Sequence, residues 1–107
     1  MRLFRVVRHD PPTHDDFTSH EAMGKPLPKR ADAALARRWR GVSVLTTLEL
    51  AREVGRGGRL GSWVAELEVP DSVERDIDAE RPLGRHLDLF GATPEQLLGY
   101  TLRIHPL

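Results

Sequence analysis

The sequence predicts a single α+β domain over residues 1–107, with a mixed, mainly antiparallel sheet and short helices. The chain has 107 residues, which is close to the usual size of one domain. Segments with the two-residue period of strands alternate along it with short segments of helical character. Most connections between these segments are too short for the crossovers that parallel strands require, and this favours antiparallel pairing.

The first forty residues predict one strand, an irregular segment and one helix. Residues 3–7 are apolar apart from Arg5, and the prolines at 11–12 end this strand because proline cannot donate to a ladder. Residues 13–28 have an irregular pattern with one helical turn. Residues 30–39 are rich in alanine and contain no helix breaker, so they predict a short helix.

The middle of the chain predicts a strand that leads directly into a helix, and then a second strand. Residues 41–45 form the first of these strands, and Thr47 caps a helix over residues 48–54. Residues 62–69 alternate clearly, as a half-buried strand does. One side of this strand carries Trp63, Ala65, Leu67 and Val69, and the other carries Val64, Glu66 and Glu68.

The last third of the chain predicts three short strands and one helix. Residues 73–77 form a short edge strand, residues 85–90 alternate, and residues 100–104 form the closing strand. Thr93 and Pro94 open a short helix between the last two strands. The apolar positions of the three clearest strands predict the core residues, which are Trp63, Ala65, Leu67, Leu45, Val42 and Leu89.

The composition excludes several classes of protein. Cysteine is absent, which excludes disulfide scaffolds, thiolate zinc sites and cysteine nucleophiles. No segment approaches the ~20 apolar residues that span a bilayer, and the first residues lack the apolar run of a signal peptide. We therefore expect a cytoplasmic protein without a membrane partner. Because 16 basic residues balance 16 acidic ones, we expect no general attraction to nucleic acids.

The balanced net charge conceals two halves of opposite sign. Residues 1–59 carry twelve Lys/Arg and seven Asp/Glu, a net of +5, whereas residues 60–107 carry four and nine, a net of −5. In one interpretation, the two halves form opposed faces that solvate each other. In the other, the first half forms a cleft for an anionic ligand, in which Arg5, Arg8 and one of the arginines at 37, 38 and 40 converge on a phosphate.

Two groups of polar residues are candidates for catalysis or metal binding. Glu66 and Glu68 lie on one strand face about 6–7 Å apart, a separation at which two carboxylates can act as general acid and base. The alternative is that they form the solvated face of a half-buried strand. His9, His14 and His20 have spacings of five and six residues, which match no known pair of metal ligands, so we expect no metal site.

Arg5 and Ser43 are polar residues inside otherwise apolar strands. An arginine that points inward from a short strand requires an anionic partner, because an unpaired buried charge is costly. That partner is either a phosphate of a ligand or a carboxylate of the neighbouring strand, Glu66 or Glu68. Ser43 interrupts the apolar run of residues 42–45 just before the expected helix.

With these residues in this order, the sequence resembles the ADP-ribosyltransferase superfamily, of which it would be a minimal version. The resemblance implies that Arg5, together with Arg8, binds a phosphate or ribose of NAD and that Ser43 holds the nicotinamide side. It also implies that a polar residue on a later strand acts on the ribose. The candidates for this catalytic role are His86, Asp88, Glu66 and Glu68.

The sequence also resembles a group of small bacterial, actinobacterial proteins. They share the patterns Phe-Arg-Val-Val, Asp-Phe-x-Ser and Gly-x-Ser-Val, which match residues 4–7, 16–19 and 41–44.

Three hypotheses follow. The chain is an NAD-binding transferase or NAD-degrading enzyme of toxin type, a non-catalytic partner in a toxin–antitoxin or toxin–immunity pair, or a structural domain whose Arg5 pairs with a strand carboxylate.

Overall fold

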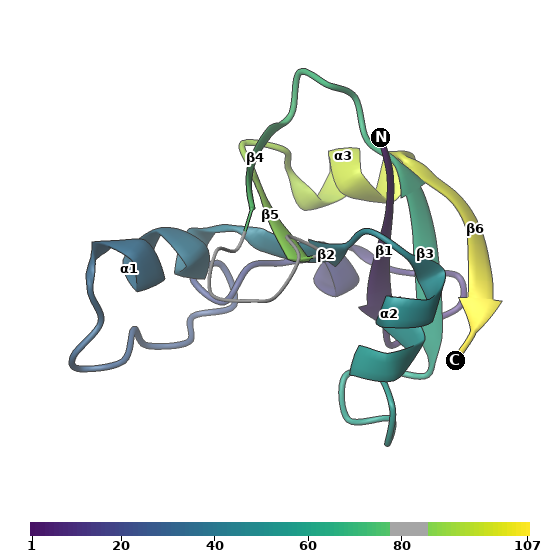
Figure 1. The fold of residues 1–107 in the computed structure, drawn as a ribbon, viewed down its shortest axis with the longest axis horizontal. Coiled ribbons are helices and arrows are strands. Elements are labelled where there is room, and N and C mark those ends of the chain that lie inside the picture. Colours follow the sequence, from purple (N-terminus) through teal and green to yellow (C-terminus); the bar gives the residue numbers. More distant parts are fainter. Residues whose placement is uncertain (78–85) are drawn as a thin grey trace.

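The computed structural model describes residues 1–77 and 86–107, which form one six-stranded antiparallel sheet with short helices beside it (Figure 1). The strand order across the sheet is β4-β5-β2-β1-β3-β6. The α+β class is confirmed, and every strand pairing among the described residues is antiparallel. The strands are β1 (Arg2–Val7), β2 (Val42–Leu45), β3 (Trp63–Glu68), β4 (Glu74–Ile77), β5 (His86–Phe90) and β6 (Thr101–Pro106).

Each α-helix begins at a polar cap that satisfies a free backbone N–H. A carboxylate oxygen of Asp32 accepts from the amide of Leu35, 2.8 Å away, at the start of α1 (Ala33–Arg40). Thr47 caps α2 (Leu48–Val54), and Thr93 caps α3 (Pro94–Gly99), as the sequence predicts. A short 3-10 helix, η1, covers His14–Phe17.

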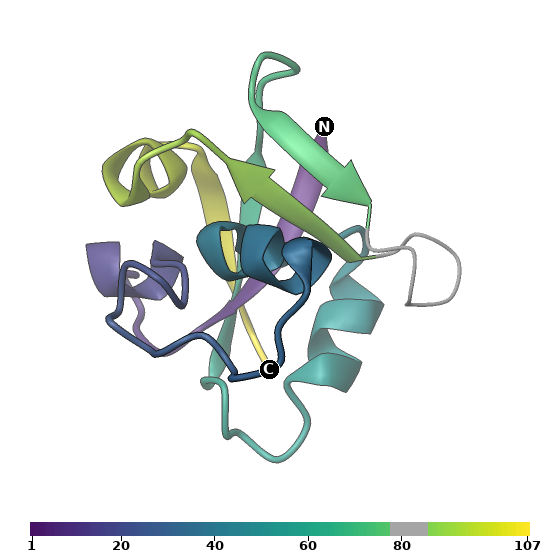
Figure 2. The same cartoon turned by 90° about the vertical axis from the view of Figure 1, so that its left-hand side faces the viewer.

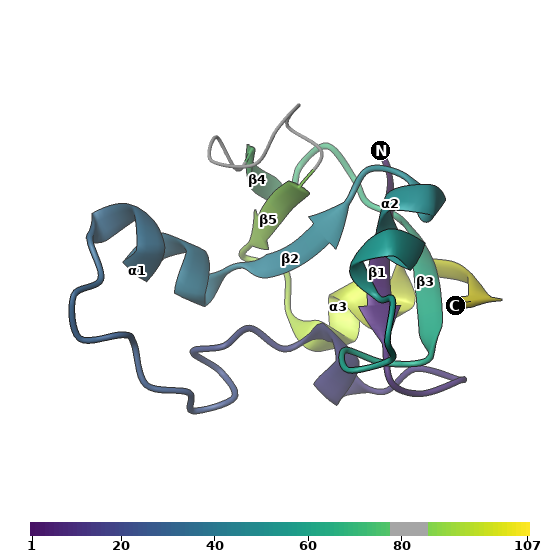
Figure 3. The same cartoon turned by 60° about the horizontal axis from the view of Figure 1, so that its bottom comes forward.

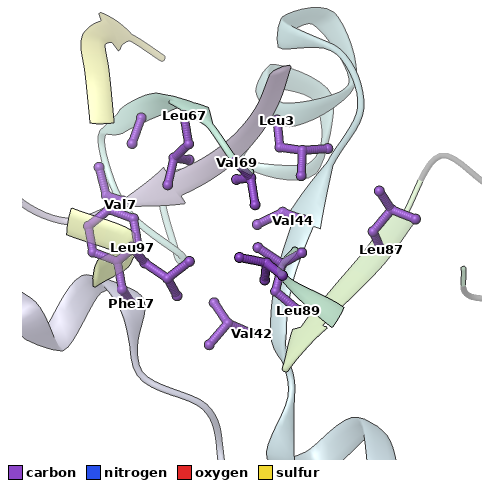
Figure 4. Packing of buried hydrophobic residues seen from close by; sticks show 12 residues of the cluster. Leu3, Val7, Phe17, Val42, Val44, Leu67, Val69, Leu87, Leu89 and Leu97 are labelled. Carbon is purple, nitrogen blue, oxygen red and sulfur yellow. The ribbon is translucent and has the colours of Figure 1, made fainter. Parts of the chain in front are cut away.

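The sheet has a core on each face, with different helices covering each one (Figure 2). Phe17 of η1 and Leu97 of α3 pack against one face, in the main core shown in Figure 4. A smaller core on the other face lies beneath α2 and contains Ala51 and Leu45. All six predicted core residues pack in these cores: Ala65, Leu67, Val42 and Leu89 are buried in the main core, Leu45 is buried in the smaller core, and Trp63 packs partly buried against the main core.

Strand β1 places its residues on the two faces in alternation. Leu3 and Val7 are buried in the main core, so Arg5 between them lies on the same face. Phe4 packs with the smaller core on the opposite face. β1 pairs with β3 over six residues, but the pairing of β1 with β2 is limited to Phe4 and Leu45. Strands β4, β5 and β2 therefore join strands β1, β3 and β6 at the single pair of Phe4 and Leu45, next to Arg5.

Helix α1 lies at one end of the molecule, away from β3 and β6 (Figure 3). None of its residues is buried, and residues 18–32 lead out to it from η1. In the part of the chain that the structure describes, no helix has the length and apolar character needed to span a membrane.

Candidate functional site

Arg5 lies where β1 and β2 diverge, and its guanidinium group joins the two segments. Its Nε donates to the backbone carbonyl of Asp16, 2.6 Å away, and its NH1 nitrogen donates to the carbonyl of Ser43, also 2.6 Å away. Burial lowers the pKa of Arg5 to about 10, against the opposing effect of the Asp16 charge. The structure shows no ion pair of Arg5 with another described residue. Its charge is thus partly desolvated and bonded to neutral carbonyls.

Ser43 connects Arg5 to a polar pair on β5. The Ser43 hydroxyl is hydrogen-bonded to Nε2 of His86, and Oδ1 of Asp88 lies 4.0 Å from the same nitrogen. The register explains this grouping, because Ser43 lies opposite Asp88 and Leu45 lies opposite His86. His86 and Asp88 are buried, whereas Ser43 is partly exposed.

Glycine at position 41 permits the close approach of the chain to this pair. A Cβ at Gly41 would lie 2.9 Å from the Cβ of Asp88 and 3.0 Å from the ring of Phe90. Any larger side chain would therefore displace the start of β2 from β5, and with it Ser43.

The geometry of Ser43, His86 and Asp88 differs from that of a serine-nucleophile triad. In such a triad the serine and the carboxylate contact different nitrogens of the imidazole, so the ring can accept a proton on one side while it is held on the other. Here both groups approach Nε2 of His86.

Four of the predicted site residues form a contiguous chain. Arg5 contacts the carbonyl of Ser43, the Ser43 hydroxyl contacts His86, and His86 lies next to Asp88. Strand alternation places the Arg5 side chain on the face of the main core, whereas the other three side chains lie on the face of the smaller core. They are therefore linked through the Ser43 residue rather than gathered on one face.

The predicted convergence of Arg5 and Arg8 with an arginine of α1 is not found for Arg37. The Arg37 guanidinium pairs with Asp76, lies 3.5 Å from Glu74, and covers the ring of Phe90 at 4.2 Å. These contacts fasten α1 to β4 and β5 and compensate the charge of Arg37.

Arg8 contacts the loop near Arg5 through its backbone rather than through its side chain. Its side chain is exposed, and its N–H donates to Asp16.

Glu66 and Glu68 form a separate ionic cluster with Arg2. Arg2 lies 2.5 Å from the Glu66 carboxylate and 3.0 Å from that of Glu68, so the expectation that Arg5 pairs with them is wrong. His105 makes a 2.7 Å hydrogen bond to Glu66 and lowers the pKa of this carboxyl, with Arg2 and Arg103 contributing. A buried carboxyl that stays ionised is a poor general acid. β1 separates this cluster from Ser43.

Asp16 is an important residue whose role the sequence did not predict. Its carboxylate accepts from the amide of Arg8 at 2.8 Å, the amide of Thr13 at 2.9 Å and the ring of His9 at 2.9 Å. Burial opposes ionisation, but these hydrogen bonds hold the pKa of Asp16 below its usual value. Asp16 thereby fixes the loop whose carbonyl receives Arg5. The Thr-x-x-Asp spacing of residues 13–16 was the local signal for it.

Other features of the described residues lie away from this arrangement. A shallow hollow is lined by Thr13, His14, Asp15 and Leu98, none of which is a predicted site residue. Within residues 1–77 and 86–107, no three His, Asp or Glu side chains are grouped so that they could hold a metal ion.

The contiguous residues Arg5, Ser43, His86 and Asp88 are the candidate functional site. Comparisons of the chain with models of protein families, with curated proteins and with solved structures gave no match.

Proposed function

We propose that the protein is an ADP-ribosyltransferase-like domain that binds NAD or a related nucleotide phosphate next to Arg5. One observation carries this proposal. A partly buried guanidinium, without an ion pair among the described residues, contacts Ser43, which is itself hydrogen-bonded to His86. A partly desolvated charge of this kind attracts an anion strongly, because the surrounding water screens it less than it screens an exposed charge.

Arg5 has the donors that a diphosphate requires. A guanidinium group carries five N–H donors, and the carbonyls of Asp16 and Ser43 each accept from one nitrogen of Arg5. The remaining donors are available for a planar, bidentate contact with phosphate oxygens. The two carbonyls also orient the group, so little side-chain freedom is lost when a ligand binds.

The order of elements supports the same proposal. The resemblance described above implies an arginine on the first strand, a serine on a strand that runs into a helix, and a polar residue on a late strand. Arg5 lies on β1, Ser43 lies on β2 directly before α2, and His86 begins β5. We assign the ribose contact to His86, oriented by Asp88, and the nicotinamide side to Ser43. These side chains lie on the opposite face of the sheet from the Arg5 guanidinium, so a ligand that contacts both must pass where β1 and β2 diverge.

Calorimetric titration of NAD and ADP-ribose tests this assignment. We expect binding to the wild-type protein and a loss of at least tenfold in affinity for Arg5→Lys, since lysine cannot form two parallel hydrogen bonds. Ser43→Ala should cost about 0.5–1.5 kcal/mol, the contribution of one neutral hydrogen bond. Arg2→Lys is the matched control, because Arg2 lies on the same strand but pairs with Glu66 and Glu68. Absence of heat for the wild-type protein at millimolar ligand would contradict the proposal.

Release of nicotinamide from NAD distinguishes an enzyme from a binding protein. If His86 acts on the ribose, wild-type protein should release nicotinamide and His86→Ala should not. An enzyme that consumes NAD should also arrest the growth of cells that express it without a partner.

A non-catalytic interaction module is the second candidate, and the sheet edges favour it. Among residues 1–77 and 86–107, β4 and β6 are the edge strands. Each exposes an apolar side chain: Ile77 is 64% exposed and Leu102 is 50% exposed. An exposed edge can pair with a strand of another protein, such as the partner in a toxin–antitoxin or toxin–immunity pair. Harmless expression together with a failed NAD titration would favour this function.

A further inference from the structure

The rings of His20 and Trp39 form a stacked pair near the surface. Their centroids are 4.5 Å apart and the rings are inclined by 29°. His20 is exposed and Trp39 is partly exposed. The indole Nε1 donates to the carbonyl of Lys25 at 2.9 Å, and the carbonyl of Trp39 accepts from the amide of Glu21 at 3.0 Å. The Trp39 ring is thus held by the segment that leads to α1, and the His20 ring stacks against it.

Both rings are connected to Arg5 by short stretches of chain. Asp16 accepts from Nε of Arg5 and lies four residues before His20, whereas Ser43 accepts from NH1 and lies four residues after Trp39. Four residues span at most about 14 Å. The base and the diphosphate of a nucleotide are separated on this scale, so one nucleotide can reach from Arg5 to the rings.

The charges around the rings suit an anionic ligand with a neutral base. Burial, Lys25 and Arg5 all lower the pKa of His20. The imidazole is therefore mainly neutral near pH 7. A flat base can stack on the neutral ring without removing water from a charged group. Lys25 provides a further positive charge beside the ring.

We propose that His20 and Trp39 form the base-binding surface of the Arg5 site, so that its ligand is a nucleotide rather than a simple phosphate. This inference rests on the proposed function, because it assumes that Arg5 binds the diphosphate. Stacking of a base on an aromatic side chain is generally worth 5- to 150-fold in affinity, which corresponds to 1–3 kcal/mol.

Tryptophan fluorescence tests the inference directly. Trp39 and Trp63 are the two tryptophans of the chain, so Trp63→Phe leaves Trp39 as the single emitter. We expect ADP-ribose and ADP to change its emission and pyrophosphate to bind without this change. We also expect His20→Ala to weaken ADP-ribose binding about tenfold and to leave pyrophosphate binding unchanged, with His20→Phe restoring most of the affinity.

The outcomes separate the two proposals. Calorimetric binding of ADP-ribose with unchanged Trp39 emission, and with equal affinity in His20→Ala, would overturn the base-binding surface and leave the phosphate site at Arg5 intact. Absence of binding by both ADP-ribose and pyrophosphate would overturn both proposals. If His20→Ala does not fold, the emission of Trp39 in Trp63→Phe decides the question alone.

Discussion

Replacement of Arg5 by methionine measures whether this arginine serves stability or ligand binding. Burial lowers the pKa of Arg5 well below its usual value, to about 10, and at about 1.4 kcal/mol per pKa unit this costs the charged form about 3 kcal/mol. Against this cost, the bonds to the carbonyls of Asp16 and Ser43 stabilise the fold by about 1.5–3 kcal/mol each, since the donor is charged. The two bonds together therefore equal the cost of burial or exceed it by up to about 3 kcal/mol.

Arg5→Met should therefore lower the free energy of unfolding by at most about 3 kcal/mol, because methionine retains the apolar part of the side chain. Urea denaturation followed by circular dichroism measures this difference. The same variant should lose binding of ADP-ribose. A loss of stability above about 4 kcal/mol, or complete unfolding, would refute the reasoning and show that Arg5 is a structural connection between β1 and β2.

The remaining predictions concern the loop, the ionic clusters and one glycine. Asp16→Asn should lower the free energy of unfolding by about 2–4 kcal/mol in urea, because an amide NH₂ would face backbone donors that the carboxylate accepts from; unchanged stability would show that the loop does not depend on Asp16. The folded-state pKa values of Asp16 and Glu66 are lowered, so the stability they contribute is present above their unfolded values near pH 4 and is lost as pH falls through the folded values. Thermal melts between pH 7 and 3 should show this loss, with a shallower dependence for Glu66→Gln, and equal slopes would contradict it. Gly61→Ala should destabilise the protein by about 1–3 kcal/mol, because the new Cβ would lie 2.1 Å from the carbonyl oxygen of Val7. The control Gly99→Ala should leave the stability unchanged, because no atom lies within 4 Å of the position of its Cβ.

Local patterns in the sequence were sufficient to predict the elements and the buried faces of the strands. The alternation of residues 62–69 predicts β3 and places Ala65 and Leu67 in the main core. The prediction of a half-buried strand is wrong, because Val64 on the other side of β3 is buried in the smaller core beneath α2. Thr47 and Thr93 predict the starts of α2 and α3, because a cap bonds within three residues of itself. Asp32 caps α1 in the same way and places its start at Ala33, three residues after the predicted start.

Partners across strands could not be predicted, because they depend on register. Arg2 and Arg5 are three residues apart on β1 and therefore lie on opposite faces. Glu66 lies opposite Phe4 and shares its face, so it meets Arg2 rather than Arg5. A shift of one residue in this register would have exchanged the two arginines, and nothing local in the sequence specifies it.

The candidate site was predicted as a set of residues but not as an arrangement. Arg5 and Ser43 stood out because each is polar within an apolar strand. The contact of Ser43 with His86 arises from the pairing of β2 with β5, which joins residues 43 positions apart. The full role of Asp16 was not predicted, because the Thr-x-x-Asp spacing of residues 13–16 indicates its bond to Thr13 but not its contacts with Arg8 and His9.

The proposed phosphate site is tested most directly by nuclear magnetic resonance of the arginine Nε–H groups and backbone amides of ¹⁵N-labelled protein during titration with ADP-ribose. We predict that the signals of the Arg5 Nε–H and of the Ser43 amide shift progressively to saturation. The Nε–H of Arg2, which is bonded to Glu68, should remain unchanged. Unchanged signals of Arg5 and Ser43 at millimolar ADP-ribose would contradict the proposal that Arg5 is held at the junction of β1 and β2 to bind a nucleotide phosphate.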